Sequence, residues 1–348
     1  MILQNSAFRL SQKLAKPAKY FPPSNGKYEV VAGLSRLGHD FGNGAQDKNI
    51  FQFDEQWETY RHQKLASRQE DLDKYYLNIS ADNALRAKVV HRLINTLVAE
   101  SPQLFRVSEI ASTGNRVLDC LLTREAISVD GDGELLDVTR AKQSARPIPE
   151  YEDAIDAIVS QLQEDVTIMQ INEKGGDRMV TMHVCYPNHW SVVEKIGKSF
   201  VASHTEVPHF EKLASQSSLF VSNLTHRGPF VRFAWGLATD TRLNHHAEPP
   251  ENLTMEQWKG RGFNDPTAPL YMRIERQVVY PFPEHNALMF TIRTYHRPLE
   301  ELTENESRSL FLAISDMDEK SARYKGLYNH QDAILQRIST RLPNIISL

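Results

Sequence analysis

Residues 271–280 read YMRIERQVVY, and polar and apolar side chains alternate along most of this segment. A two-residue period is typical of a β-strand with two different faces. Arg273, Glu275 and Gln277 fall on one face, and the apolar residues of the other face share it with one arginine. A second segment rich in β-branched and aromatic residues, 287–295, follows a proline-containing connection, so we expect a hairpin. If the apolar face is core, the polar face meets solvent or lines a pocket.

The rest of the chain predicts further short strands and amphipathic helices. We expect helices at 81–99 with Asp82 as cap, at 155–172, after the capping box of Thr303 and Glu306, and at 330–341, and strands within 106–140, at 178–186 and at 229–237. Helices bracket the strands instead of alternating with them, which favours an α+β fold with an antiparallel sheet. We expect a basic N-terminal arm at 1–27, a single domain at 28–300, and C-terminal helices at 301–348 packed on it.

The composition excludes several classes of protein. The 348 residues are 24% charged with a net charge of -4, so the chain lacks the basic field that holds nucleic acid. No uncharged apolar run approaches the roughly 20 residues that a membrane span requires. Cys120 and Cys185 are too few for a four-cysteine iron–sulfur cluster or a disulfide scaffold, which favours a reducing, cytoplasmic location. The basic start, from Arg9 to Lys27, is typical of a transit peptide or of a solvated arm.

Common catalytic motifs are missing from the sequence. There is no Gly-x-Ser-x-Gly nucleophile elbow, no Gly-rich phosphate loop, and no Gly-x-Gly-x-x-Gly after a predicted strand. This disfavours a hydrolase and an enzyme that binds nucleotides in the usual manner. Any redox chemistry therefore needs electrons from another source.

Charged side chains on the predicted strands are candidate ligand-binding groups. Arg232, Arg273 and Arg293, with Glu275, could line an anion-binding cavity, because a guanidinium pairs with a carboxylate in bidentate fashion. Cross-strand ion pairs on a solvated sheet face are the alternative. His204 follows an apolar stretch in a short polar loop and is a candidate metal or haem-iron ligand, whereas a satisfied or exposed histidine is the alternative.

Four segments carry a more specific signal. They are Gln163-Glu164-Asp165, Tyr186-Pro187-Asn188-His189-Trp190 continuing to Glu194-Lys195-Ile196-Gly197, His204 to Pro208, and Arg273-x-Glu275-Arg276-Gln277 continuing to Phe290-Thr291-Ile292-Arg293. Together with the segment from Arg232 to Trp235, they resemble the alpha subunit of the haem-dependent oxidative N-demethylases. The resemblance covers about residues 20–300 and is most specific in the second half of the chain.

The resemblance implies a fold and an activity. The fold is a PAS-like antiparallel sheet with flanking helices, with additional N-terminal and C-terminal helical segments, and it holds haem b. Dioxygen activated there removes a methyl group from a small secondary amine such as dimethylamine and releases formaldehyde. Electrons come from NADPH through separate flavin and iron–sulfur reductase subunits.

The resemblance also implies residue roles. His204 matches the family's His-x-Pro-Val-Pro position and is the expected axial iron ligand, with His183 and His189 as the next candidates. Glu275 matches the glutamate of Arg-x-Glu-Arg-Gln and is the expected catalytic acid or base. The expected cofactor-binding residues are three arginines that pair with the haem propionates and two tryptophans that wall the cavity, for which core packing is the alternative: Arg273, Arg232, Arg293, Trp190 and Trp235.

Two positions depart from the family pattern. Glu206 stands where the family has proline, and Ala234 stands where asparagine is expected before Trp235. The first change frees the backbone beside His204, and the second removes a hydrogen-bonding side chain. The sequence therefore leaves two alternatives open: a non-catalytic PAS-like protein that binds haem or a small ligand as a sensor, and an interaction subunit whose pocket has decayed.

Overall fold

A seven-stranded sheet runs through the centre of the computed structural model, which describes residues 14–141 and 147–342. From one edge to the other, its strands are β1 (Ser35–Arg36), β9 (Phe230–Ala238), β10 (Tyr271–Phe282), β11 (Ala287–Pro298), β7 (Asp165–Ile171), β8 (Asp177–His183) and β2 (Tyr76–Asn78). A four-stranded sheet contains β3 (Phe105–Ile110), β4 (Asn115–Cys120), β5 (Glu125–Val129) and β6 (Leu135–Arg140) in that order. Neighbouring strands pair antiparallel, which confirms the predicted α+β class with antiparallel sheets.

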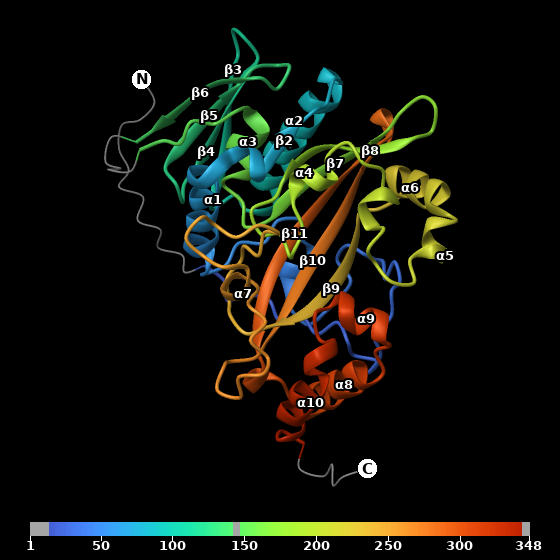
Figure 1. The fold of residues 1–348 in the computed structure, drawn as a ribbon. Coiled ribbons are helices and arrows are strands. Elements are labelled where there is room, and N and C mark those ends of the chain that lie inside the picture. The colour runs from blue at the N-terminus through green and yellow to red at the C-terminus, as the bar shows by residue number, and fades with distance from the viewer. Residues whose placement is uncertain (1–13, 142–146, 343–348) are drawn as a thin grey trace.

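Helices surround the two sheets. They are α1 (Trp57–Asp71), α2 (Asn83–Glu100), α3 (Ala154–Val159), α4 (Val192–Lys195), α5 (Glu211–Ala214), α6 (Ser217–His226), α7 (Met255–Trp258), α8 (Glu304–Ser315), α9 (Glu319–Tyr324) and α10 (Gln331–Ser339). Figure 1 shows the four-stranded sheet and α2 near one end of the long strands β10 and β11, and α8 and α10 near the other. Within the described residues, no helix is long and apolar enough to cross a membrane.

The predicted hairpin is confirmed as β10 and β11. Its ladder runs from the pair of Tyr271 and Pro298 to the pair of Phe282 and Ala287, and so it includes Pro281, a residue of the connection expected between the two strands. The reason is that β9 stops pairing with β10 at Val279, so Pro281 lies where β10 is an edge strand and proline is tolerated.

Several other sequence predictions are confirmed. The strands expected at 178–186 and 229–237 are β8 and β9, and the helix expected at 81–99 is α2. Asp82 caps α2 by accepting a hydrogen bond from the Leu85 N–H. Thr303 and Glu306 form the expected capping box of α8, because each side chain bonds the backbone of the other residue. The helix expected at 330–341 is α10.

The helix predicted at 155–172 is wrong beyond Val159. Only α3 forms there, and residues 165–171 are the strand β7, which pairs with β11 on one side and β8 on the other. Residues 161–164 between the two elements are buried, and Gln163 and Glu164 accept backbone N–H groups of Asp54 and Gln52. A short apolar run is compatible with a helix or with a buried central strand, and the pairing partners decide the outcome.

The two sides of the seven-stranded sheet differ in character. One side carries the core: Val278 of β10 packs with α2 and α3, and Ile274 packs with α8 and α10. On the other side, Val279 packs against α6. The residues that follow on this same face, toward the N-terminus of β10, are polar: Gln277, Glu275 and Arg273. We call this stretch, with Arg232, Ala234 and Gly236 of β9 and His296 of β11, the polar face. Its position confirms the predicted division of β10 into an apolar and a polar face.

The N-terminal arm expected at 1–27 is described only from residue 14. There, Lys16 pairs with Glu55 and Lys19 pairs with Glu301. Tyr20 is buried and donates a hydrogen bond to Asp47. The described part of the arm thus contacts the rest of the molecule, while the side chains of Lys16 and Lys19 are exposed. Arg9 and Lys13 lie outside the described residues.

Candidate functional site

On the polar face, residues of β9 lie directly opposite residues of β10, and two of the three pairs join a charged residue to a small one. Arg232 lies opposite Gln277, Ala234 opposite Glu275, and Gly236 opposite Arg273. β10 is central in the sheet, β9 pairs with β1 only at Phe230 and Val231, and Arg232 and Glu275 are half-buried. A Cβ built on Gly236 would meet no atom within 4 Å. The surface directly above Gly236 is therefore open for at least a methyl-sized group.

Glu275 lies among several cationic side chains. Its carboxylate accepts a hydrogen bond from the Gln277 amide at 3.1 Å, and its Oε1 lies 3.9 Å from Arg273 Nε. Lys325, just after α9, donates to the carbonyl of Trp235 at 2.6 Å. Burial lowers the pKa of Lys325 to about 8; Glu275 opposes this shift, and Arg261 and Arg232 add to it. The polar face thus carries an excess of positive charge.

Arg273 is fully buried and ties two loops to the sheet. Its guanidinium donates to the carbonyl of Tyr186 at 2.8 Å and to that of Arg242 at 3.2 Å. The same two loops bond each other, because the N–H of His189 donates to the His245 carbonyl and the N–H of His245 to the Pro187 carbonyl. Arg273 therefore positions the loops beside the polar face, and its buried Nε makes no hydrogen bond in the described residues but lies 3.9 Å from Glu275 Oε1.

His204 lies at the other end of the polar face, on a turn of 3-10 helix, 202–204. Its ring contacts Phe200, which packs with Phe230 of β9, two residues before Arg232. The His204 Nδ1 lies 2.7 Å from the Phe200 carbonyl, so it must carry the proton that it donates, and Nε2 carries none. Burial, which outweighs this hydrogen bond, lowers the pKa of His204 to about 4. The imidazole is therefore neutral and oriented, as an iron ligand requires.

Trp190 is linked to the segment that carries His204. Lys195 Nζ lies 5.1 Å from the centre of the Trp190 ring and donates to the carbonyl of Ser203 at 2.5 Å. Trp190 also packs against the small cluster of Met182, Val184 and Val192. Glu206, which departs from the family pattern, is exposed.

The structure does not bring Arg293 and Trp235 to the polar face. Arg293 lies opposite Arg276, and Trp235 opposite Ile274, so both point to the core side of the sheet. Arg293 is fully buried, pairs with Asp54 at 2.6 Å, and lies 3.7 Å from the centre of the Tyr60 ring. Alternation along 229–237 already puts Trp235 on the face opposite to Arg232, whereas the face of Arg293 depends on the register between strands, which is not visible in the sequence.

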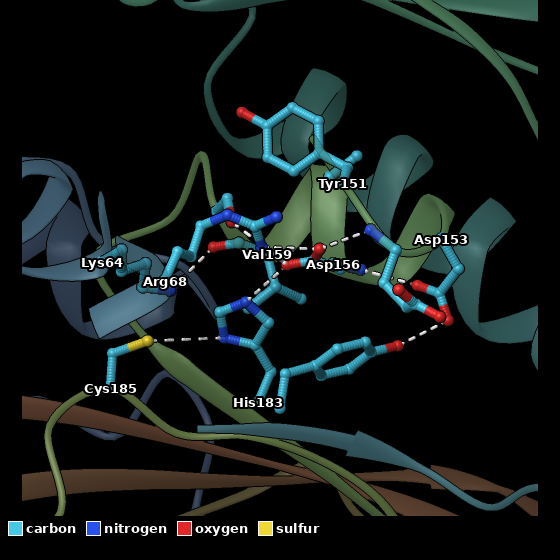
Figure 2. Close-up of polar contacts among 12 residues, drawn as sticks. Lys64, Arg68, Tyr151, Asp153, Asp156, Val159, His183 and Cys185 are labelled. Carbon is cyan, nitrogen blue, oxygen red and sulfur yellow. Dashed lines mark hydrogen bonds and ion pairs between the residues drawn. The ribbon is translucent and has the colours of Figure 1, made fainter. Parts of the chain in front are cut away.

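A second polar cluster lies in the protein interior (Figure 2). His183 Nε2 lies 3.1 Å from Asp156, which also pairs with Arg68, and His183 Nδ1 lies 4.0 Å from Cys185 Sγ. Asp165, His183 and Cys185 place ligand atoms within 4.8 Å of one another. Lys64 donates to the carbonyls of Val159 and Glu164 beside them.

The chemistry of this cluster is that of a buried structural network. Burial raises the pKa of the Cys185 thiol, with Asp165 adding to the shift, so the thiol is protonated and no free thiolate is present to attack a substrate. Burial also lowers the pKa of His183, whose Nε2 is held by Asp156. His183 is thus not placed to be the alternative iron ligand.

Two cations beside the polar face, Arg261 and Lys325, could not be predicted from the sequence. Both come from segments outside the sheet, the loop after α7 and the end of α9. Each reaches Glu275 or Arg273 only through the tertiary fold, and no local pattern marks it. Such a cluster of cations around one carboxylate can bind an anionic ligand. The neutral histidine next to it offers a ring nitrogen to the same ligand.

One comparison with known proteins bears on this arrangement. The model of the family described as "Haem-dependent oxidative N-demethylase, alpha subunit-like" matches residues 43–335. The match spans most of the chain and includes every residue of the polar face together with His204.

Proposed function

The chain belongs to the haem-dependent oxidative N-demethylase alpha subunit-like family, and from this premise we propose that it removes a methyl group from a small secondary amine and releases formaldehyde. The family name implies dependence on haem and the presence of other subunits. In our proposal the haem is haem b, the amine resembles dimethylamine, and separate flavin and iron–sulfur reductase subunits deliver the electrons. A PAS-like core and a cytoplasmic location are part of the same proposal.

The observation that supports the proposal most directly is the protonation state of the His204 imidazole. Its proton is held on Nδ1 by the Phe200 carbonyl, so Nε2 can donate its lone pair to iron. The polar face fits the remainder of haem in two ways. Arg232 Nε is buried without a hydrogen-bond partner among the described residues, as a group that awaits a carboxylate would be, and Arg273 Nε has only the Glu275 carboxylate at 3.9 Å. The space directly above Gly236 is open, so a ligand can approach the sheet there.

The chain's own residues then take distinct roles. Bound haem supplies the iron at which dioxygen is activated. His204 would hold the iron, and Arg232 and Arg273 would compensate the charge of the propionates. Glu275 accepts a hydrogen bond from the amine nitrogen, or moves a proton at its Oε1, while Gln277 holds Oε2.

Two of the predicted cofactor-binding residues are not part of this proposal, and one further residue is kept. Arg293 and Trp235 are left out, since both side chains lie on the core side of the sheet. Trp190 stays as a wall residue, because Lys195 links it to the segment that carries His204.

The second candidate function is a non-catalytic haem or small-ligand sensor with the same site. Ala234 favours it, because this residue lies directly opposite Glu275 and offers no hydrogen bond where the family has an amide side chain. Loss of that partner would weaken the control of substrate orientation without affecting the iron ligand.

A spectroscopic titration separates the two functions. Haemin is added to the purified protein, dithionite reduces it, and dimethylamine is then titrated while the Soret band is recorded. The demethylase predicts an amine-dependent shift of the band and, with oxygen and a reductase, release of formaldehyde. A Soret band that amines leave unchanged, with no formaldehyde formed, would favour the sensor.

A further inference from the structure

Arg261 is a cation without a counter-ion. It lies on the loop between α7 and β10 and is half-buried. Across residues 14–141 and 147–342, Arg261 makes no hydrogen bond and no ion pair, and its Nε is buried without a partner. Burial, with the nearby charge of Arg273, lowers the pKa of Arg261 to about 10. An uncompensated charge in such surroundings is costly unless a ligand supplies the opposite charge.

The side chain of Arg261 packs against the backbone of Gly326. Gly326 follows Lys325 with a φ of +72°, and a Cβ built on it would lie only 2.7 Å from Arg261 Cζ. The guanidinium therefore lies directly on the bare backbone at the end of α9. Gly326 directly follows Lys325, and Arg261 is near enough to Lys325 to help lower its pKa, while no carboxylate of the described residues pairs with Arg261.

The neighbouring acids are already engaged. Glu275 is bonded by Gln277 and lies beside Arg273, while Asp240 is paired with Arg242 and His245. Arg232 has only a long contact, 3.5 Å, with the Val31 carbonyl. Three cations of the polar face thus exceed the carboxylates within their reach: Arg261, Arg232 and Lys325.

We propose that Arg261, together with Lys325, forms a carboxylate-binding site at the edge of the polar face. The inference rests on the proposed haem function and deepens it. The carboxylate is either a propionate of haem or the acid group of a substrate such as an N-methyl amino acid. A guanidinium fork and a nearby ammonium suit either source.

The propionate source is tested by comparing haemin with haemin dimethyl ester, which lacks both negative charges. The wild-type protein should bind haemin about 10- to 100-fold more tightly than the ester, and Arg261→Gln should lose most of this preference. Arg261→Lys should retain part of it. Arg308→Gln removes an exposed, i,i+4-paired arginine of α8 and serves as the matched control, with the wild-type preference intact.

The substrate source is tested on the haem-loaded protein with N-methylglycine and dimethylamine. If the substrate brings the carboxylate, haemin and its ester bind equally, N-methylglycine shifts the Soret band at lower concentration than dimethylamine, and Arg261→Gln removes this advantage. Both sources are overturned if Arg261→Gln behaves as the wild type in both titrations.

A measurement without haem keeps this inference separate from the proposed function. Acetate, compared with acetamide at equal concentration, should raise the melting temperature of the haem-free wild type and leave that of Arg261→Gln unchanged. If wild-type protein binds no haemin, the proposed function fails, while the acetate result still decides the carboxylate site. Equal melting curves of both proteins with acetate and acetamide would overturn it.

Discussion

Replacing Arg293 by methionine should destabilise the fold while leaving the affinity for haemin nearly unchanged. Arg293 matches the family motif and was expected to hold a propionate, but its side chain lies on the core side of the sheet. There it pairs with Asp54 at 2.6 Å, and both side chains are fully buried. The substitution would leave the Asp54 carboxylate with hydrogen bonds from the Gln56 N–H and the Gln163 amide only.

The expected magnitude follows from this geometry. Removing one partner of a buried ion pair costs about 3–5 kcal/mol, because the other charge stays buried and uncompensated. The unfolding entropy of a chain of 348 residues is roughly 0.7 kcal/mol per kelvin, from about 2 cal/mol/K per residue. The melting temperature of Arg293→Met should therefore fall by roughly 4–7 °C.

The assay pairs thermal unfolding, followed by circular dichroism, with haemin titration below the melting transition. Arg232→Gln is the matched variant, because Arg232 lies on the polar face and makes only one long contact. It should weaken haemin binding and change the melting temperature much less than Arg293→Met does. The reasoning is refuted if Arg293→Met melts like the wild type and loses haemin affinity.

Three further predictions follow from burial and charge. Burial raises the pKa of Glu164 to about 7, so the stability that its protonation contributes is present below about pH 4.5 and is lost as the pH rises through 7. Glu164→Gln, which still accepts the Gln52 N–H, should match the wild type near pH 4.5 and be more stable at pH 8 by up to about 3 kcal/mol; equal melting temperatures at pH 8 would contradict this. Ellman's reagent should leave Cys120 and Cys185 unmodified until guanidinium unfolds the protein, because burial raises the pKa of both thiols, and rapid labelling of the folded protein would count against it. Glu275→Gln should bind haemin normally but lose the shift of the Soret band with dimethylamine, and an unchanged shift would assign the amine to another residue.

Local patterns predicted the elements whose period is unambiguous. The alternation along residues 271–280 predicted β10 and its two faces, and capping residues predicted the starts of α2 and α8. The apolar run at 166–169 fits a helix as well as a strand, and only its pairing with β11 and β8 makes it β7.

Long-range partners explain what the sequence could not predict at the site. Arg276 is buried because it donates to the carbonyls of Asn49 and Ile50, more than 200 positions away in the chain. Arg261 and Lys325 join the polar face only because a loop and the end of α9 close against it. Motif resemblance selected His204 and Glu275, but the direction of each arginine depends on strand register.

The most direct test of the account is a haemin titration of the wild type, His204→Ala and His209→Ala, monitored through the Soret band. His209 is exposed, lies five residues after His204, and pairs with Asp318, so its variant controls for changes in this loop. We predict a saturable Soret band of one haemin per chain, shifting on reduction, for the wild type and His209→Ala, and its loss in His204→Ala. A wild-type protein that leaves the haemin spectrum unchanged, or a His204→Ala variant with the wild-type spectrum, would contradict the account.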